Sequence, residues 1–109
     1  MGKLNLENLE AKGFQVTTVA EFLKLTPEDE AIIEMRLALS NAIKRRRLAG
    51  KLTQQAFARR LHSSQSRVAK IEAGDPSVGF DLLIRGLVAT GATPRDVGEI
   101  LCDYKIQVA

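Results

Sequence analysis

The sequence contains one cysteine, one histidine and no tryptophan among its 109 residues. A single cysteine, Cys102, cannot form an intramolecular disulfide, and we expect it to be a small core thiol on a helix. Metal sites need clustered cysteine, histidine or carboxylate ligands, and His62 lies far from Cys102 in the chain. We therefore expect no metal, no cofactor and no Cys–His nucleophile, and the protein is not predicted to be an enzyme.

Long apolar segments are also missing. No run approaches the ~18 residues that cross a bilayer, and the first twenty residues lack the basic and apolar regions of a secretory signal. Glycine-rich phosphate-binding patterns such as GxGxxG and the P-loop do not occur. We expect a single domain that is cytoplasmic, with no membrane partner.

Acidic residues are scarce in the middle of the chain. Residues 35–74 contain ten lysines and arginines but a single acid, Glu72. Residues 1–34 hold seven acids and three lysines, and residues 75–109 hold five acids and three cations. Cations gathered on one segment attract phosphate, so this distribution predicts a nucleic-acid surface. The alternative, a merely solvated basic face, would normally intersperse acids.

The most informative stretch is residues 53–74, TQQAFARRLHSSQSRVAKIEAG, which holds two short helical patterns separated by a turn. Apolar residues at helical spacing predict two faces turned to a core: Ala56, Phe57, Ala58 and Leu61 in the first, and Val68, Ala69 and Ile71 in the second. Thr53 and Ser64 stand at N-cap positions. Gly74 follows the second helix, where a residue that tolerates positive φ is favoured.

This stretch resembles the Cro/CI-type (XRE) helix-turn-helix family, over about residues 36–101. The residues that match the family pattern as they stand are Leu52, Thr53, Gln54, Ala58, Leu61, Ser64, Ile71, Glu72 and Gly74. The sequence departs from the pattern at His62, where the family usually has glycine, so a non-glycine residue is expected in left-handed backbone space. Ser63, where an apolar residue is common, is a milder departure.

The resemblance implies an all-α fold, a five-helix lambda-repressor-like domain over residues 35–102. We expect residues 1–34 to form an acidic N-terminal extension that serves association, and residues 103–109 to form a tail or short strand. Alternating residues at 14–17 and 104–108 permit two short strands that could pair, within or between chains.

Start signals predict the other helices. Residues 26–30 combine a hydroxyl cap, a proline and acids, and begin one long helix or two abutting ones before Gly50. Ser77 is expected to cap the helix after the helix-turn-helix, and Thr93 with Pro94 to start the last one. The predicted buried positions of these two helices are Val78, Leu82, Leu83, Leu87, Val88, Val97, Ile100 and Leu101.

The resemblance also implies which residues contact DNA, because the family docks the start of its second motif helix in the major groove. The candidates for base readout are Gln65, Ser66 and Lys70, with Gln65 suited to adenine N6 and N7. The candidates for phosphate contact are Lys51, Thr53, Gln54, Ser64 and Arg67. In the family, positions matching Arg47 and Glu72 form a buried salt bridge; two independent surface charges are the alternative.

We therefore predict a sequence-specific, nucleoid-associated transcriptional regulator that binds double-stranded DNA. We expect it to bind as a homodimer, because one short helix reads few base pairs. The alternative is an antitoxin similar to the HigA type, which would bind a protein toxin through the N-terminal extension and autoregulate its operon. A scaffold that does not bind DNA would need packing to neutralise the cations, and nearby acids are too few. The first two functions share the DNA surface, so the sequence does not separate them.

Overall fold

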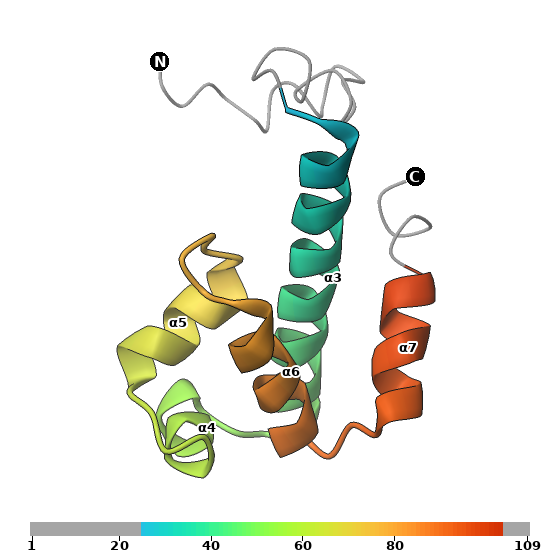
Figure 1. The fold of residues 1–109 in the computed structure, drawn as a ribbon. Helices are drawn as coiled ribbons and strands as arrows, with labels where there is room; N and C mark the ends of the chain where they lie inside the picture. The colour runs from blue at the N-terminus through green and yellow to red at the C-terminus, as the bar shows by residue number, and fades with distance from the viewer. Residues whose placement is uncertain (1–24, 104–109) are drawn as a thin grey trace, which may run out of the picture. The chain divides into compact units, whose positions relative to one another are not determined.

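The structure is a computed structural model and describes residues 25–103. All regular structure in this part of the chain is helical: α3 (Pro27–Ala49), α4 (Gln54–Arg60), α5 (Gln65–Ala73), α6 (Phe80–Ala89) and α7 (Pro94–Cys102) (Figure 1). The predicted all-α, five-helix fold is confirmed. The expected strands at 14–17 and 104–108 lie outside the described residues, as does most of the N-terminal extension.

Helix α3 is one continuous helix of 23 residues, which decides between the one long and two abutting helices that the sequence left open. A reciprocal cap starts it: Thr26 Oγ1 accepts from the Asp29 amide at 3.1 Å, and Asp29 Oδ2 accepts from the Thr26 amide at 3.2 Å. Pro27 occupies the first helical position, where its missing N–H costs nothing. The helix ends in a turn at Lys51, whose φ is 58°.

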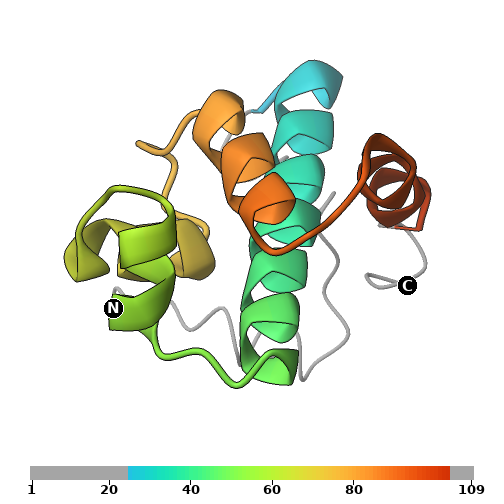
Figure 2. The same cartoon turned by 90° about the horizontal axis from the view of Figure 1, so that it is seen from below.

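The core lies where α3, α4, α5 and α6 meet, and its largest fully buried apolar side chains are Leu39, Ile43, Phe57, Val68, Ile71, Leu83 and Leu87. Figures 1 and 2 show α3 and α6 between the α4–α5 pair and α7. A Cβ at Gly86 would lie 3.2 Å from Ile43 Cδ1, so the glycine permits close approach of α6 to α3. This packing fixes α4 and α5 on one side of the domain.

Two turns use left-handed residues that are not glycine. His62 has φ 55°, as the sequence departure at this position predicted, and Lys51 with φ 58° was not anticipated. In both turns the backbone closes the preceding helix: Ser63 N donates to Ala58 O at 2.9 Å, and Leu52 N donates to Arg47 O at 3.1 Å. The turns keep their geometry despite the residue type, because these bonds satisfy carbonyls at the helix ends.

The expected cap at Ser77 is wrong. The Ser77 amide donates to Asp75 Oδ1 at 2.8 Å in a local turn, and α6 begins later, at Phe80, with Gly79 as its N-cap. Val78 therefore precedes the helix, although it is buried as expected. The Ser77 bond also lowers the pKa of the Asp75 carboxyl.

Two burial predictions near the C-terminal end are also wrong. Val88 is 53% exposed, because it lies on the face of α6 that turns away from the core. Cys102 is exposed as well, at the last residue of α7. Helix α7 contains no fully buried residue and packs only through partly buried side chains, Val97, Ile100 and Leu101.

Candidate nucleic-acid interface

Side-chain caps fix the starts of the two motif helices. Thr53 Oγ1 accepts from the Ala56 amide at 3.0 Å, and Ser64 Oγ accepts from the Arg67 amide at 3.1 Å. Gly74 ends α5 with φ 74°, in the left-handed conformation predicted for it. Because each cap uses only a lone pair of its hydroxyl oxygen, the O–H proton of Thr53 stays available to a phosphate oxygen. The Ser64 hydroxyl also lies 3.3 Å from that of Ser66, and either of the two can donate to the other.

Helix α5 presents an apolar face to the core and a polar face to solvent. Val68 and Ile71 are 0% exposed and seat the helix against the core. The exposed residues of its outer face are Gln65, Ser66, Arg67 and Lys70, together with Ala73 at the end. The structure thus brings all three candidates for base readout and one for phosphate contact onto one accessible surface.

A buried ion pair joins α3 to α5. Arg47 Nε donates to Glu72 Oε2 at 2.5 Å and Nη2 donates to Glu72 Oε1 at 2.9 Å, with the two side chains only 9% and 4% exposed. Arg47 Nη1 also donates to the Leu52 carbonyl at 2.7 Å. The hydrogen bonds that the Arg47 guanidinium donates to Glu72 raise its pKa. The end of α3, the turn before α4 and the end of α5 are therefore held by one side chain.

Two side-chain hydrogen bonds connect the ion pair, through Gln54, to Gln65, a candidate for base readout. Gln54 Nε2 donates to Glu72 Oε1 at 3.2 Å, and Gln65 Nε2 donates to Gln54 Oε1 at 2.6 Å. An ionised carboxylate can only accept, so Glu72 turns the NH₂ group of Gln54 inward and its carbonyl oxygen toward Gln65. The carbonyl oxygen of Gln65 and one of its N–H groups remain free.

The candidates for phosphate contact lie around this series of hydrogen bonds. Lys51 and Thr53 are exposed before α4, Ser64 is exposed before α5, and Arg67 follows in the first turn of α5. Gln54 is only partly exposed, because its side chain lies between Glu72 and Gln65. Its role at a phosphate therefore rests on its second N–H.

Arg36 makes two contacts that the sequence did not predict. Its Nη1 donates to the Val78 carbonyl, and its guanidinium lies 5.0 Å from the centroid of the Phe80 ring. These bonds tie α3 to the loop after α5. Neither partner could be found from sequence, because both lie more than 40 residues from Arg36 along the chain and no periodicity relates them.

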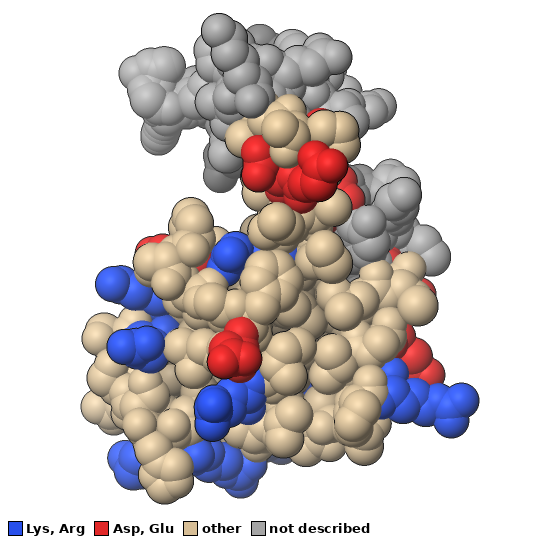
Figure 3. All heavy atoms as spheres, in the orientation of Figure 1, with Lys and Arg blue, Asp and Glu red and all other residues tan. Residues whose placement is uncertain are grey.

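Positive charge gathers over α4 and α5 in the space-filling view (Figure 3). The exposed cations of the motif and of the turn before it are Lys51, Arg59, Arg60, Arg67 and Lys70. The sole acid of this region, Glu72, is neutralised by Arg47 and buried. The surface potential over the two helices is therefore positive, as phosphate binding requires.

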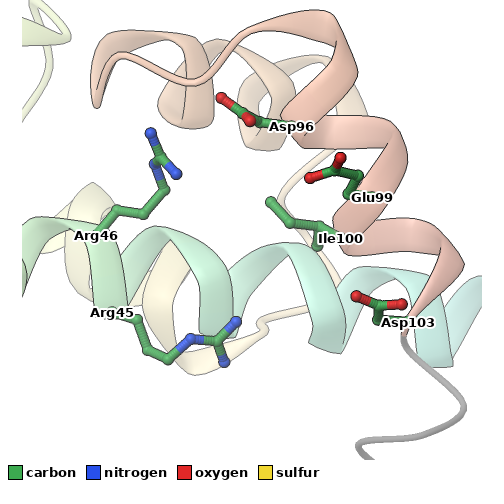
Figure 4. A pocket seen from close by; sticks show the side chains of 6 residues that line it. All are labelled: Arg45, Arg46, Asp96, Glu99, Ile100 and Asp103. Carbon is green, nitrogen blue, oxygen red and sulfur yellow. The ribbon is translucent and has the colours of Figure 1, made fainter.

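The structure also has a shallow hollow of about 200 Å³ between α3 and α7 (Figure 4). Its lining residues are Arg45, Arg46, Asp96, Glu99, Ile100 and Asp103. None of the predicted DNA contacts lines it. Across residues 25–103 no helix is long and apolar enough to cross a membrane, and no group of three potential metal ligands occurs there.

The helix-turn-helix family model matches residues 43–96, which span the end of α3 through the start of α7. No curated protein and no solved structure matched the chain. The matched segment belongs to the Cro/CI-type (XRE) helix-turn-helix family, and the protein is a DNA-binding helix-turn-helix protein.

Proposed function

We propose that the protein is a transcriptional regulator that reads a specific DNA sequence with α5 and binds its operator as a homodimer. The observation that carries this proposal is the hydrogen-bonded chain Arg47–Glu72–Gln54–Gln65, which starts in the core and ends at an exposed amide. The proposed role places the protein on the nucleoid, in the cytoplasm.

The chain of hydrogen bonds orients Gln65 before DNA arrives. A free glutamine loses side-chain entropy when it binds, and a residue already held in place loses less. Gln65 keeps one acceptor and one donor free, the combination that pairs with adenine N6–H and N7 in the major groove. Ser66 and Lys70 lie on the same outer face and extend the reading to neighbouring bases.

Phosphate contacts would set the register of α5 in the groove. Lys51 and Arg67 supply charge, while the hydroxyls of Thr53 and Ser64 and the second N–H of Gln54 supply directed donors. The first turns of α4 and α5 add backbone N–H groups at the positive ends of both helices. These contacts bind any sequence, so specificity falls to Gln65, Ser66 and Lys70.

The phosphate role is tested by salt dependence on a duplex selected from a random pool by the wild-type protein. Lys51→Ala should lower affinity for selected and scrambled duplexes alike, and reduce the slope of log K against log salt by about one unit. Arg95→Ala is the matched control, because its side chain is 86% exposed on α7, away from the motif. An unchanged slope for Lys51→Ala, or a pool that yields no enriched sequence, would contradict the proposal.

An antitoxin role remains the second proposal for the same DNA surface. It depends on the acidic extension at residues 1–34, of which residues 1–24 lie outside the described part of the chain. The extension would have to bind a basic protein toxin. Deleting residues 1–25 should then abolish capture of that toxin while leaving DNA selectivity intact; capture that survives the deletion would contradict it.

A further inference from the structure

The outer face of α3 carries two exposed leucines outside the core cluster, of which Leu37 also lies beside Gly74 at the end of α5. Leu37 is 42% exposed and Leu48 is 54% exposed, and they stand eleven residues apart on one helix. A single exposed apolar side chain is ordinary on a protein surface, and Val88 on α6 is such a case. The two leucines differ from Val88 in lying on the same face of one helix, because eleven residues make about three turns.

That spacing is a heptad pattern. Residues that recur at alternating intervals of three and four lie in one stripe along a helix, and such a stripe can form the seam of a two-helix pair where apolar residues occupy it. On α3 this outer stripe consists of Glu34, Leu37, Asn41, Lys44 and Leu48, and the core-facing residues Leu39, Ala42 and Ile43 lie on the opposite side. The stripe is thus a second seam, independent of the one that builds the core.

We infer that the outer stripe is an interface with a second copy of this chain, and that the two α3 helices pair antiparallel. Aligned on the midpoint between Asn41 and Lys44, Leu37 of one copy lies beside Leu48 of the other, twice by symmetry. Asn41 then faces Lys44, whose ammonium can donate to the amide oxygen. The inference rests on the homodimer proposed above and specifies its surface.

The distribution of charge along α3 favours the antiparallel direction. Glu34 follows the acidic first turn of α3, whereas Lys44, Arg45 and Lys51 lie at or beyond its C-terminal half. An antiparallel pair brings the Glu34 end of one helix to the basic end of the other, and opposes the two helix dipoles favourably. A parallel pair would stack Lys44 on Lys44 and Glu34 on Glu34. Apart from Lys51, none of these residues is a candidate DNA contact, so the outer stripe is separate from the reading surface.

The first test is sedimentation of the full-length chain over a range of micromolar concentrations, with circular dichroism to show that each variant is folded. Leu37→Glu and Leu48→Glu should each raise the dissociation constant of the dimer at least about tenfold. Val88→Glu, a change at an equally exposed apolar residue outside the outer stripe, should leave it nearly unchanged. A wild-type monomer throughout, or a dimer dissociated by Val88→Glu and not by the leucine variants, overturns the inference.

The second test fixes the direction by disulfide crosslinking, in a Cys102→Ser background. Leu37→Cys mixed with Leu48→Cys should form a mixed disulfide. Either variant alone should not, because its two thiols would lie about 16 Å apart along the helices and disulfides need Cα atoms within ~7 Å. Crosslinking of Leu37→Cys with itself would indicate parallel pairing and contradict the inference.

Failure of the interface and failure of the proposed function give different results. If Leu48→Glu is monomeric and still prefers a selected half-site over a scrambled one, both proposals stand. If no variant changes the oligomeric state while sequence preference persists, only the interface is wrong. If no protein prefers any sequence, the proposed function is wrong whatever the oligomeric state.

Discussion

Arg47 on α3 donates two hydrogen bonds to Glu72 on α5, 2.5 Å and 2.9 Å long, and both side chains are almost completely buried. Removing one partner of a buried pair leaves the other charge without compensation. Glu72→Gln should therefore lower the free energy of unfolding by about 3 kcal/mol, measured by urea denaturation.

The control for this variant is Glu99→Gln on α7. Glu99 pairs with Arg95 at 4.0 Å, but its side chain is 68% exposed and that of Arg95 is 86% exposed, so loss of the pair should cost roughly 0–1 kcal/mol. Equal costs for the two glutamine variants would show that burial does not strengthen the Arg47–Glu72 pair.

Ser40 supplies a prediction of opposite sign. It is 1% exposed on α3, and its Oγ has no hydrogen-bond partner within residues 25–103. A buried hydroxyl without a partner costs about 1–3 kcal/mol of desolvation, so Ser40→Ala should raise stability by about 1 kcal/mol. Ser64→Ala, which removes an N-cap, should lower it by about 1 kcal/mol. A destabilised Ser40→Ala protein would mean that the hydroxyl is satisfied in solution.

His62 stands in the left-handed region with φ 55°, where an L-residue is strained and glycine is not. His62→Gly should raise the free energy of unfolding by about 1 kcal/mol. Gly91→Ala, with φ 98° and open space around its Cβ, should lower it by a similar amount, whereas Gly98→Ala within α7 should raise it. Loss of stability in His62→Gly would show that the imidazole itself contributes contacts.

The elements that could be predicted from sequence are those decided locally. Thr53, Ser64 and Gly74 occupy caps whose chemistry depends on neighbours three or four residues away. The prediction that Ser77 caps a helix is wrong because the Ser77 amide donates to Asp75, two residues before it, in a local turn. Val78 is buried before α6 begins at Phe80, in tertiary packing that no local signal shows.

The burial errors have a similar cause. Helical spacing identifies an apolar face but does not say how much of it a neighbour covers. Helix α7 is covered on one side only, so Cys102 at its end is exposed. Val88 follows the buried Leu87 by one residue, about 100° around the helix, and therefore lies on the outward face of α6.

For the candidate site, residue types could be predicted and their connections could not. Gln54 and Gln65 were expected to contact phosphate and base independently. Their hydrogen bond, and the bond from Gln54 to Glu72, join residues 11 and 18 positions apart and depend on how α4 and α5 pack. The pre-orientation of Gln65 is thus a property of the fold that no local pattern encodes.

The central claim is that this oriented amide reads DNA. The most direct measurement titrates wild type, Gln65→Ala and Gln55→Ala against a selected duplex and its scrambled counterpart at several salt concentrations. Gln55, exposed on α4 and without a side-chain hydrogen bond in the described structure, is the matched control. Gln65→Ala should lose about 1–3 kcal/mol on the selected duplex and almost nothing on the scrambled one. Equal weakening on both duplexes would show that α5 does not read the sequence.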